Sequence, residues 1–279
     1  MKNILLPTDF SENSWNAITY ALHFFKGNPC NFYLLHVNKI SDLIPENASY
    51  ALNKGVMNQT DVISTKAKLN QFLKRIARLP YNEKHRFFTL SEYYSFIESI
   101  RKQVAKQEID YIVMGTKGAS GIKKIIMGSN TADVITRVKC TTLVVPEKAS
   151  YKKITKIAFP TDYSVSYNVQ ALQPLSDVLE QTKASLSILH VSNKSESLHV
   201  SQENNKSLLE EYFKEQNSKF YHITNKNVEE AIENFVESKG IKLITMIAKN
   251  LNYFQQLFFH SKVKEISYHT DIPFLVLHE

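Results

Sequence analysis

The chain has 279 residues, of which 43% are hydrophobic and 22% are charged, a composition too apolar for a disordered protein and a length that suits two ordinary domains. Lysine and arginine exceed aspartate and glutamate by 34 − 27, a net charge of +7. Because the basic residues are scattered, we expect a surface that attracts anionic ligands and no nucleic-acid partner.

The cysteines and the N-terminus exclude several further classes. Cys30 and Cys140 form no C-x-x-C pair, so neither a zinc site nor a disulfide framework is indicated. Residues 1–7 are typical of a short strand rather than a signal peptide, and no stretch approaches the ~18 apolar residues that span a membrane. We therefore expect a cytoplasmic protein with reduced structural thiols, no metal centre and no membrane association.

In chain order, the first half alternates apolar runs with segments of helical spacing. The predicted strands are residues 4–6, 32–37, 86–90, 111–114 and 142–145, and the predicted helices cover 15–25, 66–79 and 97–104. Residues 47–58 have no clear period and are expected to form a loop, with a lid as the alternative. This alternation predicts right-handed crossovers and a parallel sheet covered on both faces.

The same order of elements occurs twice. Residues 4–11, ILLPTDFS, recur as 157–164, IAFPTDYS, and the later strands repeat as well, with Leu34–Val37 matching Ile188–Val191 and Thr142–Val145 matching Phe274–Leu277. The second copy predicts strands near 154–159, 185–191, 219–223, 241–247 and 273–277. The expected fold class is α/β, with two open, parallel five-stranded sheets flanked by helices in domains 1–147 and 154–279, joined by a linker at 148–153.

Glycine is scarce, with seven in the chain, yet four fall between positions 115 and 128. They directly follow the predicted strand Tyr111–Met114 and lead into a helix. In an open parallel sheet, ligands bind beyond the carboxyl ends of the strands, where Gly115 and Asp9 both lie. Free N–H groups at a helix start, here Gly128-Ser129, bind phosphate oxygens. The structural alternative is an ordinary glycine-containing loop with Ser129 capping a helix.

The spacing Gly115-x2-Gly118-x9-Gly128-Ser129 resembles the ATP-binding signature of the universal stress protein family. The resemblance takes in Pro7-Thr8-Asp9, Leu35-His36-Val37 and Leu143-Val-Val-Pro146, so it covers the first copy and, more weakly, the second. It implies a tandem, Rossmann-like fold of the adenine nucleotide alpha hydrolase type. It also implies bound ATP, with AMP or ADP as alternatives and Mg²⁺ as a companion of the phosphates.

The resemblance also assigns roles to residues. Asp9 and the Val37 backbone would hold the adenosine end, Gly115 would lie near the ribose, and the residues from Gly118 onward would line the phosphates. The full set of predicted nucleotide-binding residues is Pro7, Thr8, Asp9, Val37, Met114, Gly115, Lys117, Gly118, Gly128, Ser129, Asn130 and Thr131. Helix capping is the alternative role of Asp9, and His36 is expected to satisfy a core hydrogen bond.

The second copy departs from the signature. Aligned on Ser261, the three signature glycines are replaced by Ile247, Asn250 and His260, although Asp162 and Val191 remain. A branched side chain at Ile247 would intrude where the backbone meets the ribose, so we expect one ATP site, in the N-terminal domain. The aromatic stretch 253–259 is expected to pack, with filling of the vacated pocket or a partner surface as the alternatives.

Dedicated catalysis is not expected, because no Gly-x4-Gly-Lys-Ser/Thr and no Gly-x-Ser-x-Gly motif occurs. Slow ATP hydrolysis stays open. The expected function is a nucleotide-dependent sensor or regulator in stress response, with residues 116–127 as the moving part and an unidentified protein partner. The alternative is a ligand-independent scaffold. Pairing through last strands, common in the family, implies an intrachain pseudo-dimer, and a homodimer is a further expectation.

Overall fold

The computed structural model describes residues 1–38, 59–93, 95–116, 128–192, 197–249 and 271–278. The elements of its first half are β1 (Lys2–Pro7), α1 (Glu12–Phe24), β2 (Cys30–Val37), α2 (Gln59–Ile76), β3 (His85–Glu92), α3 (Phe96–Lys106), β4 (Tyr111–Gly115), α4 (Ser129–Arg137) and β5 (Thr141–Val145). The five strands and three helices predicted for this half are confirmed, and the predicted loop or lid at 47–58 lies outside the described residues.

The second half repeats this order as far as it is described. Its elements are β6 (Lys156–Pro160), α5 (Val169–Thr182), β7 (Ser185–Ser192), α6 (Val200–Tyr212), β8 (Ser218–Thr224), α7 (Val228–Lys239), β9 (Leu243–Ile247) and β10 (Phe274–Leu277). All five predicted strands are present. The repeat in the sequence is therefore a repeat of the fold.

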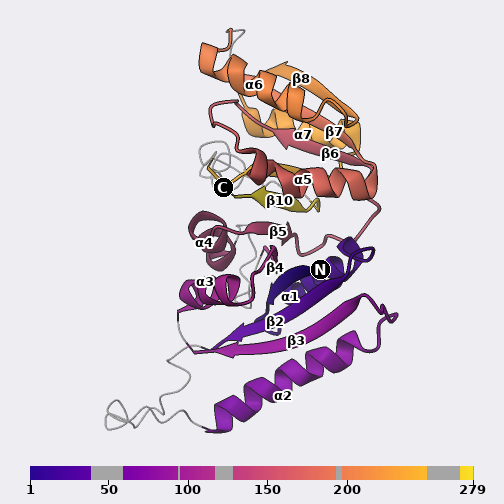
Figure 1. Cartoon of the computed structure of the whole chain (residues 1–279), viewed down its shortest axis with the longest axis vertical. Helices are drawn as coiled ribbons and strands as arrows, with labels where there is room; N and C mark the ends of the chain where they lie inside the picture. Colours follow the sequence, from indigo (N-terminus) through magenta and orange to yellow (C-terminus); the bar gives the residue numbers. More distant parts are fainter. Residues whose placement is uncertain (39–58, 94, 117–127, 193–196, 250–270, 279) are drawn as a thin grey trace.

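The two predicted sheets form one ten-stranded sheet, in the order β3-β2-β1-β4-β5-β10-β9-β6-β7-β8. Pairing within each half is parallel, whereas β5 and β10 pair antiparallel, with Leu143 opposite Leu275. Figure 1 shows β5 and β10 in the middle of an elongated molecule, with one half on either side. An outer strand of either half alone would expose unpaired N–H and C=O groups, which this pairing satisfies. The sheet thus creates the expected intrachain pseudo-dimer.

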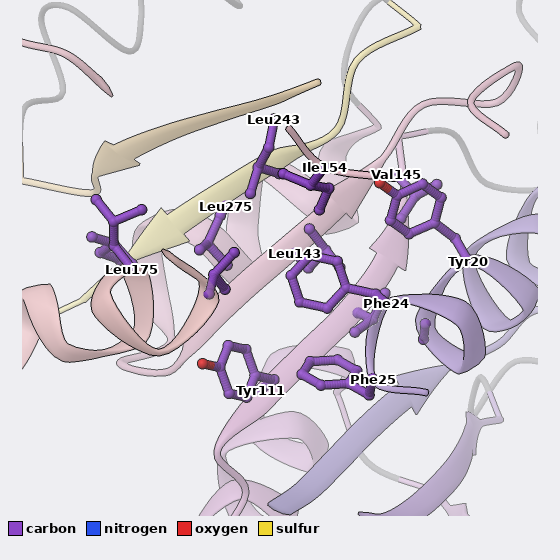
Figure 2. Packing of buried hydrophobic residues seen from close by; sticks show 14 of the residues in the cluster. Tyr20, Phe24, Phe25, Tyr111, Leu143, Val145, Ile154, Leu175, Leu243 and Leu275 are labelled. Carbon is purple, nitrogen blue, oxygen red and sulfur yellow. The ribbon is translucent and has the colours of Figure 1, made fainter. Parts of the chain in front are cut away.

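A continuous apolar core joins the halves. Figure 2 shows Leu143 of β5 and Leu275 of β10 in one packed group, with Tyr111 of β4, Phe25 beyond α1 and Leu175 of α5 around them. Burial of one leucine side chain contributes about 1.5–3 kcal/mol, so the shared group fixes the halves relative to one another.

Polar contacts add to the junction between the halves. Lys2 in β1 forms an ion pair of 2.8 Å with Asp177 of α5, and Gln181 donates to the Phe24 carbonyl at 3.5 Å. Both contacts join α5 to the first half at the rim of the core. The junction therefore combines strand pairing, apolar packing and an ion pair.

Two further sequence expectations concern the thiols and membrane spans. Cys30 and Cys140 are free and buried, and burial raises their thiol pKa values to about 11 and about 12. Neither thiol ionises near neutral pH, which agrees with a structural role. Among the described helices, none is long and apolar enough to cross a membrane.

Candidate functional site at the carboxyl end of the first half-sheet

The first half has its topological switch point between β1 and β4. From β1 the chain proceeds to β2 and β3 on one side, then crosses to β4 and β5 on the other. Connections diverge to opposite faces at such a point, which leaves room for a ligand beyond the strand ends. Pro7 and Thr8 lie at the end of β1, Val37 ends β2, and Met114 and Gly115 end β4. The structure thus brings these predicted residues to one edge of the sheet.

The turn after β1 is built by its own side chains. Thr8 Oγ1 accepts a hydrogen bond of 3.0 Å from the Phe10 N–H. Asp9 Oδ1 accepts from the Ser11 N–H at 3.0 Å and from the Ser11 hydroxyl at 2.6 Å. Ser11 is the N-cap of α1 and accepts from the Ser14 N–H. Asp9 therefore supports the capping residue and does not cap the helix, so its carboxylate is held exposed at the strand end.

Phe10 takes a backbone conformation that is rare for an aromatic residue, with φ of +65°. Its ring lies 4.4 Å from the His36 ring and 5.4 Å from the Phe72 ring, between centroids. His36 Nδ1 makes a 2.8 Å hydrogen bond with the Thr8 carbonyl, which confirms the expected structural role of His36. Strained backbone of this kind persists where its surroundings hold it, and such positions cluster at functional sites.

Gly115 is required by packing. A Cβ atom at this position would lie 2.5 Å from the Asn13 side-chain nitrogen, because α1 crosses directly over the end of β4. The Gly115 carbonyl accepts a 2.8 Å hydrogen bond from the buried Thr131 hydroxyl. Thr131 therefore connects the start of α4 to the end of β4, and its hydroxyl hydrogen is committed to that bond.

The start of α4 offers backbone donors to an anion. Gly128 is the N-cap, so the alternative of Ser129 as a cap is wrong, and within the described residues no side chain caps this helix. Ser129 and Asn130 are exposed in the first turn. Uncapped N–H groups and the helix dipole favour phosphate at such a terminus. The Gly128 N–H donates to the Thr116 carbonyl at 2.5 Å and ties the helix start to the β4 end.

Part of the predicted site falls elsewhere. Lys117 and Gly118, with the rest of the proposed moving part at 117–127, lie outside the described residues. No group of three or more potential metal ligands occurs in the described part of the chain. The described site therefore consists of three strand ends, the turn after β1 and the start of α4.

The second half builds the same turn after β6. Thr161 Oγ1 accepts from the Tyr163 N–H at 2.9 Å, and Asp162 Oδ1 accepts from the Ser164 N–H and hydroxyl at 2.9 and 2.8 Å. Tyr163 has φ of +57°, and its ring stacks on His190 with centroids 5.1 Å apart. Sequence reasoning passed over Phe10 and Tyr163, although the repeated Thr-Asp-aromatic-Ser pattern was a signal for both.

Helix α6 covers this second turn with hydrogen bonds. Gln202 donates to the Asp162 carbonyl and Asn205 to the Tyr163 carbonyl, each at 2.7 Å. The Tyr167 hydroxyl contacts Thr161 Oγ1 at 2.5 Å. The backbone carbonyls of Asp162 and Tyr163 and the Thr161 hydroxyl are therefore engaged by the protein itself.

Ile247 occupies the place of Gly115. It pairs with Leu277 at the end of β9 as Gly115 pairs with Val145 at the end of β4. The branched side chain is accommodated because α5 begins only at Val169, and Ile247 is buried in the shared core. The predicted replacements Asn250 and His260, their alignment anchor Ser261 and the aromatic stretch 253–259 lie outside the described residues.

A sequence profile of the universal stress protein family matches residues 1–146 and 153–278. The chain belongs to the universal stress protein family. It carries two such domains in tandem, as the duplicated fold indicates. A universal stress protein of Methanocaldococcus jannaschii is 27% identical over 146 residues, which are 52% of this chain and 81% of that protein.

Solved structures extend the likeness to the whole tandem. The crystal structure of a universal stress protein from Archaeoglobus fulgidus matches 98% of this chain and 95% of its own, with a TM-score of 0.64 and 19% identity, and so has the same fold. Two other universal stress proteins were crystallised with nucleotides, one with cAMP at 16% identity and a TM-score of 0.38, one with dAMP at 7% and 0.34. They match 52% and 45% of this universal stress protein, and 97% and 99% of their own chains.

Proposed function

We propose that this universal stress protein is a nucleotide-dependent sensor or regulator with one ATP site, in its N-terminal half. The observation that carries the proposal is the meeting of the β1, β2 and β4 ends with the uncapped start of α4 at one edge of the sheet. AMP and ADP share the adenosine and α-phosphate of ATP and are accepted at the same place. Mg²⁺ accompanies the phosphates.

The chemistry of the edge suits the two ends of a nucleotide. The Asp9 carboxylate, held exposed by Ser11, is an acceptor for ribose hydroxyls. The Ser129 and Asn130 N–H groups in the first turn of α4 are donors for phosphate oxygens. We infer no dedicated enzyme activity, because the roles that we propose for the described site residues are to bind and position the nucleotide. Slow hydrolysis of ATP is the most that we propose.

The second half is proposed to act as a scaffold. Its strand-end turn is covered by Gln202 and Asn205, and Ile247 stands where a backbone approach would be needed. Its β10 completes the sheet beside β5. A partner protein would therefore recognise whether the first half holds a nucleotide, and the second half would support the first half structurally.

Calorimetric titration with ATP and AMP in the presence of Mg²⁺ tests the proposal. We expect one site per chain. Ser129→Asp adds a negative charge in the first turn of α4, where it favours the helix and repels phosphate, so ATP affinity should fall more than ten-fold and AMP affinity less. Ser129→Ala is the matched control, which keeps the N–H groups and should retain most of the affinity.

Each other outcome has a definite meaning. Two sites per chain would contradict the scaffold role of the second half. No binding to the wild-type protein would contradict the ATP site and favour the ligand-independent scaffold. Equal affinity of the Ser129→Asp variant would place the phosphates away from α4.

A further inference from the structure

One face of α2 contacts both turns that flank the adenosine end of the proposed site. Thr65, Lys68, Phe72 and Arg75 are separated by three, four and three positions, so they form a single stripe along the helix. Thr65 contacts Asn38, which follows Val37. Lys68 and Phe72 contact Phe10, which follows Asp9. Arg75 contacts the first turn of α1. Helix α2 therefore joins elements that are distant in the sequence.

The first contact fixes the end of β2. Thr65 donates a 2.7 Å hydrogen bond to Asn38 Oδ1, and both residues are buried. Asn38 Nδ2 donates to Ser91 Oγ at 3.2 Å and to the Glu92 carbonyl at 3.3 Å, while the Asn38 N–H donates to the same carbonyl at 2.9 Å. The residue that follows Val37 is thus tied to β3 and to α2, so the Val37 backbone cannot move independently of them.

The second contact fixes the strained turn. The Phe72 ring meets the Phe10 ring edge-on at 5.4 Å, and Lys68 Nζ lies 5.7 Å from the centre of the Phe10 ring. Because Phe10 has a positive φ, its conformation depends on such contacts. Phe10 is next to Asp9, so the placement of the Asp9 carboxylate depends on α2 as well.

The last contact closes the stripe on α1. The Arg75 guanidinium makes two 2.7 Å hydrogen bonds to the Glu12 carboxylate and lies 4.0 Å from the centre of the Trp15 ring. Glu12 and Trp15 belong to the first turns of α1, whose N-cap is bonded to Asp9. The stripe thus contacts the residue after β2, the turn after β1 and the start of α1.

In the second half, α6 contacts the equivalent turn in a different way. This helix binds the backbone of the turn directly, through Gln202 and Asn205. Ser192, the counterpart of Asn38, makes a 2.8 Å hydrogen bond with His222 of β8. The α2 stripe contacts the side chains of Asn38 and Phe10, whereas the α6 side chains bind the backbone carbonyls of the equivalent turn.

We propose that α2 positions the adenosine end of the ATP site, with Thr65 and Phe72 as positioning residues that act through Asn38 and Phe10. This inference rests on the proposed function and adds a regulatory consequence. Because coupling between two equilibria is reciprocal, a nucleotide that fixes Val37 and Asp9 also fixes α2, and the exposed face of α2 then reports occupancy to a partner.

The test uses the full chain with Thr65→Val, which removes the hydroxyl and keeps the shape, and Thr65→Ser, which keeps the hydroxyl. We expect Thr65→Val to weaken ATP and AMP by the same factor, about five-fold, since both share the adenosine end. Thr65→Ser should stay near the wild type. In wild-type protein, saturating ATP should slow hydrogen exchange of the α2 amides from 65 onward, and less so in Thr65→Val.

The readouts separate a positioning role from a merely structural one. A purely structural Thr65 would lower the melting temperature of Thr65→Val and leave both nucleotide affinities unchanged, which would overturn the inference. Equal α2 exchange with and without ATP would overturn it too. Absence of ATP binding in the wild type would instead overturn the proposed function and, with it, this inference.

Discussion

The two halves build the same turn at the end of their first strand and then use it differently. In both, a threonine hydroxyl accepts the N–H of an aromatic residue with positive φ, and an aspartate holds the following serine. In the first half, α1 starts at once and packs on Gly115; in the second, α5 starts later and α6 covers the turn. A local motif that is repeated within the chain therefore does not by itself make a site, because the neighbouring helices decide which of its groups stay exposed.

The largest expected loss of stability comes from the junction between the halves, where β5 and β10 contribute equivalent leucines. Leu143→Ala and Leu275→Ala each remove a fully buried side chain from paired positions of β5 and β10. Each should lower the free energy of unfolding by about 2–5 kcal/mol, through lost burial and the cavity left behind. Urea unfolding measures both. A loss at Leu143 several times that at Leu275 would show that the halves do not share the core equally.

A second prediction concerns the residue that follows the last strand of each half. By the repeat, His278 after β10 corresponds to Pro146 after β5, and burial lowers the His278 pKa from 6.5 to about 4. Below pH 6.5 the His278 imidazole binds a proton in the unfolded chain, whereas in the folded chain it stays neutral down to about pH 4. The His278 contribution to stability should therefore fall between pH 6.5 and about 4, by about 3 kcal/mol, and change little below that.

His278→Gln removes this titration and should flatten that part of the pH profile of the unfolding free energy. Other histidines titrate in the same range, since burial also lowers the pKa values of His85 and His190. The difference between the two profiles isolates His278. Parallel profiles for wild type and variant would contradict the prediction.

Gly115 and Ile247 occupy equivalent positions and differ in the space around them. Gly115→Ala places a Cβ 2.5 Å from the Asn13 side chain and should cost about 1–3 kcal/mol of stability. The second half has Ser166 at the position of Asn13, outside the helix. Adding Asn13→Ser should therefore recover much of the loss, as a double-mutant cycle would measure. Simply additive losses would contradict a direct clash between the two residues.

The smallest expected effect concerns the hydroxyl groups that contact the threonine of each turn. Thr8 Oγ1 contacts the Ser14 hydroxyl at 2.9 Å, whereas Thr161 Oγ1 contacts the Tyr167 hydroxyl. Tyr167→Phe removes this one buried hydrogen bond, and Ser14→Ala removes the contact with Thr8 and the bond that the Ser14 hydroxyl donates to the Ser11 carbonyl. Each variant should cost about 1 kcal/mol. Only Ser14→Ala should also change ATP affinity in calorimetry. A change in ATP affinity with Tyr167→Phe would show that the second turn takes part in binding.

Local patterns predicted much of this molecule. The apolar runs predicted each strand that the structure describes in both halves, and the repeat placed Asp9 and Asp162 in equivalent turns. Glycine spacing pointed to the β4 end but did not reveal that Asn13 packs on Gly115, because Asn13 is remote from it in sequence. The glycine spacing also did not reveal that Gly128, and not Ser129, is the N-cap of α4. The Gly128 N–H donates to the carbonyl of Thr116, a residue that is remote from it in sequence.

The sequence by itself determined the two copies, their strand order and the turn after each first strand, because hydrogen bonds between residues two or three positions apart specify that turn. Only the tertiary structure decided that two sheets become one through β5 and β10, and that α2 reaches Asn38 and Phe10 whereas α6 covers the Asp162 turn. These outcomes depend on contacts between elements far apart in the chain, whose register and distance no local pattern encodes.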